Sequence, residues 1–243
     1  MGLWPLAGEW DGYEWFRLAD VPSRPRRKAP VKATGTRSAK GAANGAAKGS
    51  ATAVDSADSA EDDAGAAMGR WMVDRLDDEP LWLADDSERV LLVDLDNLRA
   101  APSRLRARLA VVVSLARQAD HAAFAGQTGA VRRSLPWLAE FADLAQTVPD
   151  GSDLADHALL DRAVELAGPP QQFVVVSNDG IFVELADRGP LALLSPGADA
   201  MSDRLSDSAH RVVDLAALEK QAAAARTRSQ RAARRRQNLQ RAG

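Results

Sequence analysis

Short apolar stretches alternate with stretches of helical length from Arg89 onward, and this alternation constrains the fold more than any other feature. The strand-length stretches are Val90–Val93, Ala122–Ala125, Ala145–Val148, Phe173–Val176, Leu191–Leu194 and Arg211–Val213. The predicted helices between them are Ser103–Ala119, Ala130–Leu144 with a break near Pro136, Ser152–Ala167 and Ile181–Asp187. Such alternation is typical of a parallel sheet with helices on both faces. We therefore expect a three-layer α/β/α domain over residues 89–215.

The segments outside this domain differ from it in composition. Residues 1–21 hold five of the twelve aromatic residues, and we expect them to pack on the domain or to bind a protein partner. Residues 22–67 are mainly Ala, Gly, Ser and charged residues, which bury too little apolar surface to fold, so a disordered linker is expected. Residues 68–88 regain large apolar side chains and should dock on the domain. Residues 216–243 are rich in Ala, Arg and Gln and favour a basic helix.

The formal net charge of −3 conceals a strong segregation of charge. Residues 21–54 carry eight Lys or Arg and no acid, and residues 219–243 carry eight basic residues and one acid. Residues 85–218 carry twelve Arg and twenty Asp or Glu. Basic arms of this kind commonly bind nucleic acid, while a concentrated acidic centre is suited to hold cations.

Cysteine is absent, which excludes disulfides, thiolate metal sites and a cysteine nucleophile. The chain shows no secretory signal and no apolar run of about 18 residues that could span a bilayer. We therefore expect a cytoplasmic protein that does not enter the membrane. The abundance of Ala and Arg is typical of a GC-rich bacterial genome. A homodimer is left open.

Acidic residues follow two of the predicted strands. Asp94 ends the strand that begins at Val90, and Asp179 follows the strand Phe173–Val176. In an open parallel sheet, sites form outside the carboxyl ends of strands, where the strand order reverses. If these two strands are neighbours, the carboxylates of Asp94 and Asp179 converge, and Asp156 approaches from the start of its helix.

Three converging carboxylates repel one another unless a cation lies between them. Mg²⁺ or Mn²⁺ is the expected ion, because hard cations prefer carboxylate oxygens and water. Such an ion polarises a phosphoryl oxygen and lowers the pKa of a water that it binds, which suits hydrolysis of a phosphodiester.

The neighbouring polar residues have alternative interpretations. Asp96 is either a site acid or a turn residue, and Asn97 is either a turn former or part of the site. Asp153 is either a ligand in place of Asp156 or an acid favoured by the helix dipole. Asp161 is either a peripheral ligand or a solvated acid. Ser177 either orients a site group or caps the helix that follows it.

The order of these motifs resembles the NYN domain, a branch of the PIN-like metal-dependent ribonucleases, over about residues 89–215. The motifs are a buried strand with Asp94-Leu95-Asp96-Asn97, the step Asp156-His157-Ala158-Leu159, and a second buried strand with Ser177-Asn178-Asp179. The resemblance implies that Asp94, Asp156 and Asp179 hold Mg²⁺ or Mn²⁺, that Asn97 and Ser177 support them, and that the two strands are adjacent. Many members carry a further Asp where this chain has Ile181, so one ligand of the family pattern is missing.

A second resemblance competes with the first. Asp94-Leu95-Asp96-Asn97 is also similar to the first motif of haloacid-dehalogenase-type phosphatases, in which Asp94 would be the nucleophile and Asp96 the acid–base residue. That family most often uses a lysine to balance the phosphoryl intermediate, and no lysine occurs between Gly49 and Glu219. The motif set therefore favours the nuclease. A non-catalytic RNA-binding scaffold of the same fold is a third alternative.

RNA fits the basic arms better than a small phosphorylated metabolite does, because Lys and Arg neutralise a phosphate backbone. Arg104, Arg108, Arg132 and Arg133 are predicted to extend a backbone-binding surface around the acidic centre, or to be solvated helix residues. The sequence thus predicts a divalent-metal-dependent endoribonuclease.

Overall fold

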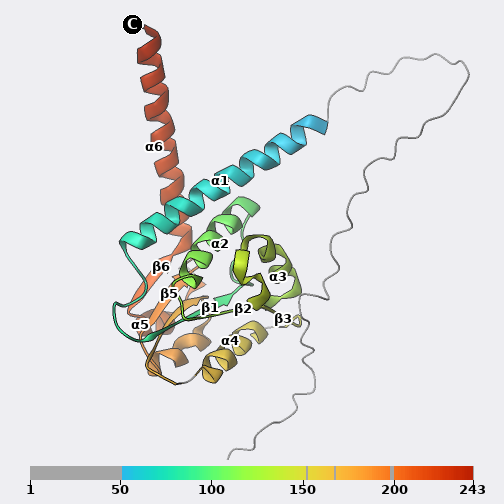
Figure 1. Ribbon diagram of the computed structural model, residues 1–243, viewed down its shortest axis with the longest axis vertical. Coiled ribbons are helices and arrows are strands. Elements are labelled where there is room, and N and C mark those ends of the chain that lie inside the picture. Colours follow the sequence, from blue (N-terminus) through green and yellow to red (C-terminus); the bar gives the residue numbers. More distant parts are fainter. Residues whose placement is uncertain (1–50, 152, 167, 198–199, 243) are drawn as a thin grey trace, which may run out of the picture.

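The computed structural model describes residues 51–151, 153–166, 168–197 and 200–242. Its centre is a six-stranded, fully parallel sheet with the strand order β3-β2-β1-β4-β5-β6 (Figure 1). The strands are β1 (Glu88–Asp94), β2 (His121–Gln127), β3 (Ala145–Val148), β4 (Gln171–Val176), β5 (Leu191–Ser195) and β6 (Arg211–Asp214). All six strands were predicted from the sequence, and the parallel α/β architecture is confirmed.

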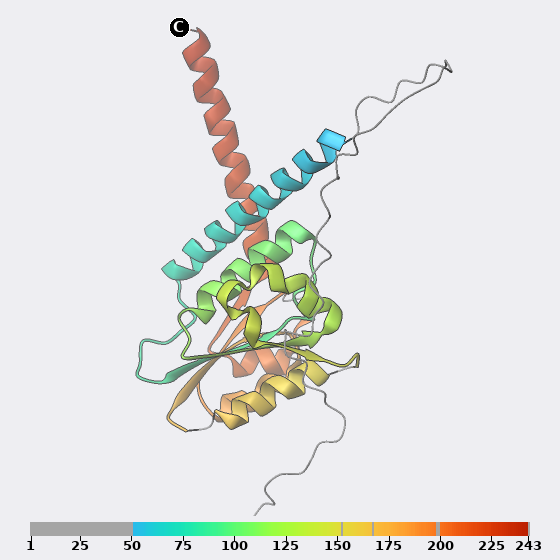
Figure 2. The same cartoon turned by 45° about the vertical axis from the view of Figure 1, so that its right-hand side comes forward.

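Helices cover both faces of the sheet (Figures 1 and 2). They are α1 (Ala51–Asp78), α2 (Pro102–Ala116), α3 (Thr128–Ser134), α4 (Leu154–Glu165), α5 (Asp203–Ser208) and α6 (Leu215–Ala242). Three 3₁₀ helices are η2 (Leu135–Trp137), η3 (Ala139–Leu144) and η4 (Gly180–Asp187). The break expected near Pro136 is the change from α3 to η2. The helix α5 was not predicted, because Asp203–Ser208 buries only Leu205 and therefore shows no apolar periodicity.

Successive residues of the central strands point to opposite faces and build two cores. In β1, Leu91 and Val93 pack in the core beneath α1, α2 and the start of α6. The intervening Val90 and Leu92 pack in the other core, with α4, η4 and α5. Because β1 is buried on both faces, its sequence is continuously apolar instead of alternating, as expected for an interior parallel strand.

The helix α1 corrects one boundary of the predicted linker. Residues 51–67 were expected to be disordered, yet α1 begins at Ala51, and the same helix includes most of the expected docking segment. Gly65 and Gly69 let α1 approach α2 closely: a Cβ atom on Gly65 would lie 2.6 Å from the carbonyl oxygen of Ser103, and one on Gly69 would lie 2.8 Å from the Cβ atom of Ala110. We call this close contact of Gly65 and Gly69 with α2 the seam between the two helices. It buries surface without large apolar side chains, whose scarcity in residues 51–67 was the reason for predicting disorder there.

The boundary at the other end of the domain is also less sharp than expected. The predicted basic helix is present as α6, but Leu215, Leu218 and Ala222 of its first turns belong to the core under α1 and α2. The expectations for residues 1–21 and 22–50 lie outside the described residues. None of the helices in the described part of the chain combines the length and apolar character that crossing a bilayer requires.

Candidate metal centre

The strand order reverses between β1 and β4, which pair in parallel over Glu88–Val93 and Gln171–Val176. The adjacency of these two strands, implied by the family resemblance, is therefore confirmed. Asp94 is the last residue of β1, and Asp179 lies three residues after β4 at the N-terminal cap of η4. The helix α4 also starts at this edge, because it follows β3 in a parallel sheet. Side chains from three elements thus meet at the position where open α/β sheets bind ligands.

Asp94 is buried and held by hydrogen bonds on both carboxylate oxygens. Its Oδ1 accepts from the backbone N–H of Asp96 at 2.9 Å, and its Oδ2 accepts from the amide of Asn97. The hydroxyl of Ser177 lies 3.4 Å from the same Oδ2. Asn97 and Ser177 therefore position Asp94, as the resemblance implied.

Ser177 also connects the two acidic strand ends. Its hydroxyl accepts hydrogen bonds from the amide of Asn97 at 3.2 Å and from the backbone N–H of Asp179 at 3.1 Å. The carboxylate of Asp179 in turn accepts from the backbone N–H of Ile181 at 3.0 Å. A side chain that is fully buried and bonded to both strand ends fixes their relative position.

Three carboxylates converge beside this network. One oxygen each of Asp153, Asp156 and Asp179 lies within 4.8 Å of the others, and together these groups could hold a metal ion. Asp156 is only 6% exposed, and its Oδ1 has no hydrogen-bond partner. A buried carboxylate oxygen without a partner is costly. A cation bound by the three groups would supply the partner that Oδ1 lacks.

The sequence offered Asp153 and Asp156 as alternatives, and the structure brings both into the group. Asp153 adopts a left-handed backbone conformation with φ of 61° at the N-terminal cap of α4. This conformation places it one turn before Asp156 and beside the same oxygens. The pattern of residues along α4 does not reveal such a turn. Asp94 lies close enough to interact electrostatically with Asp156, although it is not in the group of three.

The electrostatics of the site reflect crowding of negative charge. Burial, followed by the charges of Asp94, Asp179 and Asp153, raises the pKa of Asp156 to about 7. Burial also raises the pKa of Asp94, and the hydrogen bond from Asn97 opposes this rise. Without a cation, a large fraction of Asp156 side chains is therefore protonated near pH 7, and a cation that binds there must displace this proton.

Other predicted site residues lie elsewhere or have structural partners. The Oδ2 of Asp96 accepts a hydrogen bond from the backbone N–H of Gln127 at 2.8 Å, which holds the end of β2 against the loop after β1. This contact fits the interpretation of Asp96 as a turn residue, and its other oxygen, Oδ1, has no hydrogen-bond partner. Asp161 is exposed on α4, away from the buried side that carries Asp156.

The four arginines predicted to bind nucleic acid fall into two classes. Arg132 and Arg133 are exposed on α3, which starts at the carboxyl end of β2. Arg108 is buried, and its Nε lies 2.6 Å from the carboxylate of Glu219. Its predicted contact with RNA is wrong, because an internal ion pair engages this side chain. Arg104 is 54% exposed and lies 3.5 Å from the same carboxylate.

One residue that the sequence did not single out connects the site loops. The side-chain amide of Gln127 donates to the carbonyl oxygen of Gly151 at 3.2 Å. This contact ties the end of β2 to the loop that precedes α4. The only signal in the sequence is its position between Gly126 and Gly129, where β2 ends and α3 begins.

Comparison of the chain with models of protein families gave no match, and no curated protein matched it at a significant level.

Proposed function

We propose that this protein is a divalent-metal-dependent ribonuclease. The observation that carries the proposal is the group of three carboxylates, in which one oxygen each of Asp153, Asp156 and Asp179 lies within 4.8 Å of the others. One oxygen of the buried Asp156, Oδ1, also has no hydrogen-bond partner. All the donors are carboxylate oxygens, which suits Mg²⁺ or Mn²⁺ better than softer metals. When bound, such a cation would polarise a phosphoryl oxygen and lower the pKa of a water molecule.

The roles of the chain's own residues follow from their contacts. Asp156 and Asp179 would hold the cation, with Asp153 beside them at the start of α4. Asp94, fixed by Asn97 and Ser177, would keep its charge directed toward Asp156. This fixed arrangement would preserve the ligand geometry while substrate binds and leaves.

The choice of RNA rests on three supports. The motif order resembles that of the NYN domain, the exposed Arg132 and Arg133 lie on a helix that starts at the site edge, and the two chain ends are basic. Arginines around an acidic centre can bind the phosphates that flank a scissile bond without neutralising the metal ligands.

The test is cleavage of labelled RNA in Mn²⁺ or Mg²⁺ by the wild type and by Asp156→Asn and Asp179→Asn. Asp161→Asn is the matched control, because it makes the same chemical change on the same helix at an exposed position. We expect the two site variants to lose at least about 100-fold in rate, and the control and the wild type to be equal.

The other outcomes point to other functions. Cleavage that persists undiminished in both site variants would rule out this centre. Turnover of a phosphate monoester that is abolished by Asp94→Asn would indicate a phosphatase. RNA binding without any cleavage would indicate a scaffold. Ile181→Asp, which introduces the acid found in many NYN domains, is then the first substitution to test for a gain of cleavage.

A further inference from the structure

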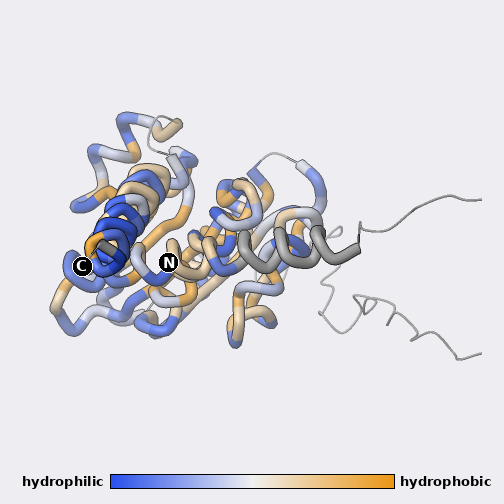
Figure 3. The backbone as a smooth tube through the Cα atoms, turned by 90° about the horizontal axis from the view of Figure 1, so that it is seen from above, coloured by the Kyte–Doolittle hydropathy of each residue, from blue (hydrophilic) through white to orange (hydrophobic). Residues whose placement is uncertain are grey.

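The helix α6 continues well beyond its contacts with the domain. After Ala222, the last residue of its buried side, residues 226–241 are all exposed (Figures 1 and 2). We call Ala223–Ala242 the arm. At 1.5 Å per residue its 20 residues extend about 30 Å. Figure 3 shows that this helix is largely hydrophilic.

The arm carries positive charge on all sides. Its seven arginines are Arg226, Arg228, Arg231, Arg234, Arg235, Arg236 and Arg241. With 3.6 residues per turn, no arc of the helix wider than about 80° lacks an arginine. The last acid in the sequence is Glu219, so the arm contains no carboxylate that could neutralise these charges. A helix that is polar all round and lacks internal ion pairs requires a different source of stabilisation.

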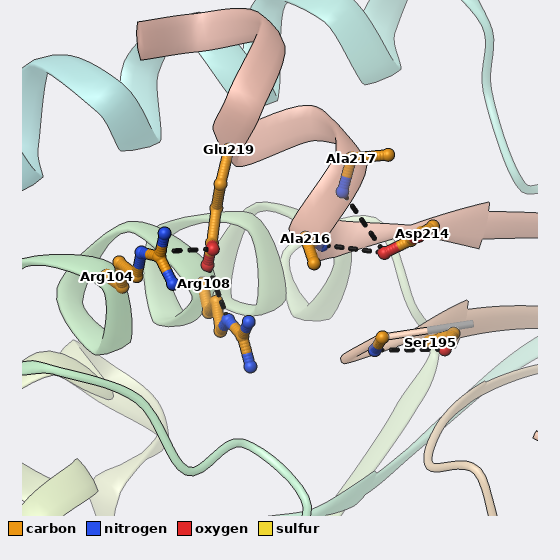
Figure 4. A network of polar contacts seen from close by, with 8 residues as sticks. Arg104, Arg108, Ser195, Asp214, Ala216, Ala217 and Glu219 are labelled. Atoms are coloured by element: carbon orange, nitrogen blue, oxygen red, sulfur yellow. Dashed lines mark hydrogen bonds and ion pairs between the residues drawn. The ribbon is translucent and has the colours of Figure 1, made fainter. Parts of the chain in front are cut away.

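The base of α6 is fixed to the domain by an internal ion pair. Glu219 is 2% exposed, and its carboxylate binds Arg108 at 2.6 Å and Arg104 at 3.5 Å (Figure 4). Asp214 caps the helix by accepting from the backbone N–H of Ala216 at 2.7 Å. Because β6 is parallel to β1 and β4, the helix starts at the edge of the sheet that carries the acidic group. A buried contact therefore fixes the direction in which the arm leaves the carboxyl edge of the sheet, on the face that α1 and α2 cover (Figure 1).

We propose that the arm binds the phosphate backbone of a double-helical region of RNA, and so directs structured RNA to the acidic centre. This inference rests on the proposed function. A groove of double-helical RNA has a phosphate backbone on each side, so a helix with arginines all around it can contact both backbones at once. A flat anionic surface would contact the arginines on one side of the helix only. The binding would be independent of sequence, because the contacts would be made to phosphates.

Two other kinds of anionic partner fit the arm less well. A helix that lies on a membrane needs an apolar face opposite its basic face, and Leu239 is the one large apolar residue among residues 223–242. Single-stranded RNA is usually bound by stacking bases on aromatic side chains. The sequence contains no aromatic residue after Phe182. The arm therefore offers charge without a stacking surface.

The test uses the full chain carrying Asp156→Asn in EDTA, so that bound RNA is not cut. Into this background we would place Arg231→Gln, Arg234→Gln, Arg235→Gln and Arg236→Gln together, and separately the same four changes to Lys. Binding of an RNA hairpin and of an unstructured strand of equal length is measured by fluorescence anisotropy over a range of salt. Thermal unfolding should be the same for all versions, since these side chains are exposed.

We expect the Gln variant to bind the hairpin at least 10-fold more weakly. The slope of log K against log salt should fall by roughly 0.9 for each phosphate that the arm no longer neutralises, hence by about 3 to 4. The Lys variant should retain the slope of its parent, and the parent should bind the hairpin more tightly than the unstructured strand.

Three results would overturn the proposal. The first is a salt slope that the Gln substitutions leave unchanged, and the second is binding of the unstructured strand that is as tight as binding of the hairpin, or tighter. The third is tight binding to phosphatidylserine vesicles that depends on the four arginines, together with RNA binding that does not depend on them. The proposed function fails separately, if the wild type binds RNA through the arm but never cleaves it with Mn²⁺ or Mg²⁺.

Discussion

Asp156→Asn should stabilise the metal-free protein above neutral pH, although it removes a residue of the candidate site. The carboxyl group is buried, lacks a partner for one oxygen and faces three other carboxyl groups. Asparagine has nearly the same shape and no charge. It therefore resembles protonated Asp156 and avoids the cost of ionising this side chain in a crowded, buried position.

The magnitude follows from the change in pKa on folding. The pKa of Asp156 is raised from 3.8 to about 7. Between these values the folded protein binds more protons than the unfolded chain, so the free energy of unfolding of the wild type falls as the pH rises through this window. At about 1.4 kcal/mol per unit the difference between variant and wild type grows from pH 4 to pH 7, reaches at most about 4 kcal/mol and is then constant.

The assay is urea denaturation in EDTA at half-unit steps from pH 5 to pH 8.5, for the wild type, Asp156→Asn and Asp161→Asn. Asp161 is exposed on the same helix, so its variant should stay within about 0.5 kcal/mol of the wild type at every pH. At pH 8 the thermal midpoint of Asp156→Asn should exceed that of the wild type by on the order of 10 °C. Saturating Mn²⁺ should narrow or reverse the difference, because only the wild type retains the full group of ligands.

The reasoning would be refuted if Asp156→Asn were less stable than the wild type at pH 8 in EDTA. That result would mean that the ionised carboxylate has a favourable partner in the folded protein. A difference that does not change with pH would refute it as well, because the effect would then come from packing instead of charge.

Three further predictions concern the metal, the ion pair under α6 and the seam between α1 and α2. In thermal unfolding, Mn²⁺ at 100 times its dissociation constant should stabilise the wild type by about 2.7 kcal/mol. Asp179→Asn should not show this stabilisation by Mn²⁺. An equal stabilisation of the variant would mean that the ion binds elsewhere. Glu219→Ala should lower the free energy of unfolding in urea by about 3–5 kcal/mol, because it leaves the buried Arg108 unpaired. Glu219→Leu combined with Arg108→Met should lower it far less, because no buried charge is then left alone. Equal losses of stability in the two proteins would contradict this account. Gly65→Ala should lower the thermal midpoint by an amount equivalent to about 1–3 kcal/mol, because the new Cβ would lie 2.6 Å from a backbone oxygen and this clash outweighs the better helix propensity of alanine. Gly168→Ala should be nearly neutral, because no atom lies within 4 Å of the added Cβ. A Gly65→Ala variant that is more stable than the wild type would show that α1 does not pack tightly here.

The sheet and the position of the site could be predicted from the sequence because both depend on local patterns. Continuous apolar runs such as Val90–Val93 predict interior parallel strands, and acids placed directly after two of them predict where charge gathers. The pairing of β1 with β4 came from the family resemblance, because no local signal specifies which strands are neighbours.

The errors share a different physical origin. Arg108 looked like a solvated helix residue because its partner Glu219 lies 111 residues away in the sequence. Gly65 and Gly69 looked like part of a disordered linker because a close helix contact needs small side chains, and these also occur in unfolded segments. Asp153 could not be separated from Asp156 because the left-handed backbone at Asp153, which the residue pattern does not reveal, accompanies its place beside Asp156 and Asp179.

The most direct test of the account is single-turnover cleavage of an RNA with phosphorothioate linkages, compared with ordinary RNA, in Mg²⁺ and in Mn²⁺. Sulfur is a poor ligand for Mg²⁺ and a better one for Mn²⁺. If a cation held by Asp153, Asp156 and Asp179 contacts the scissile phosphate, the substitution should slow cleavage in Mg²⁺ by at least about 10-fold, and Mn²⁺ should restore it. Equal slowing in both metals, or cleavage that proceeds in EDTA, would contradict the central claim.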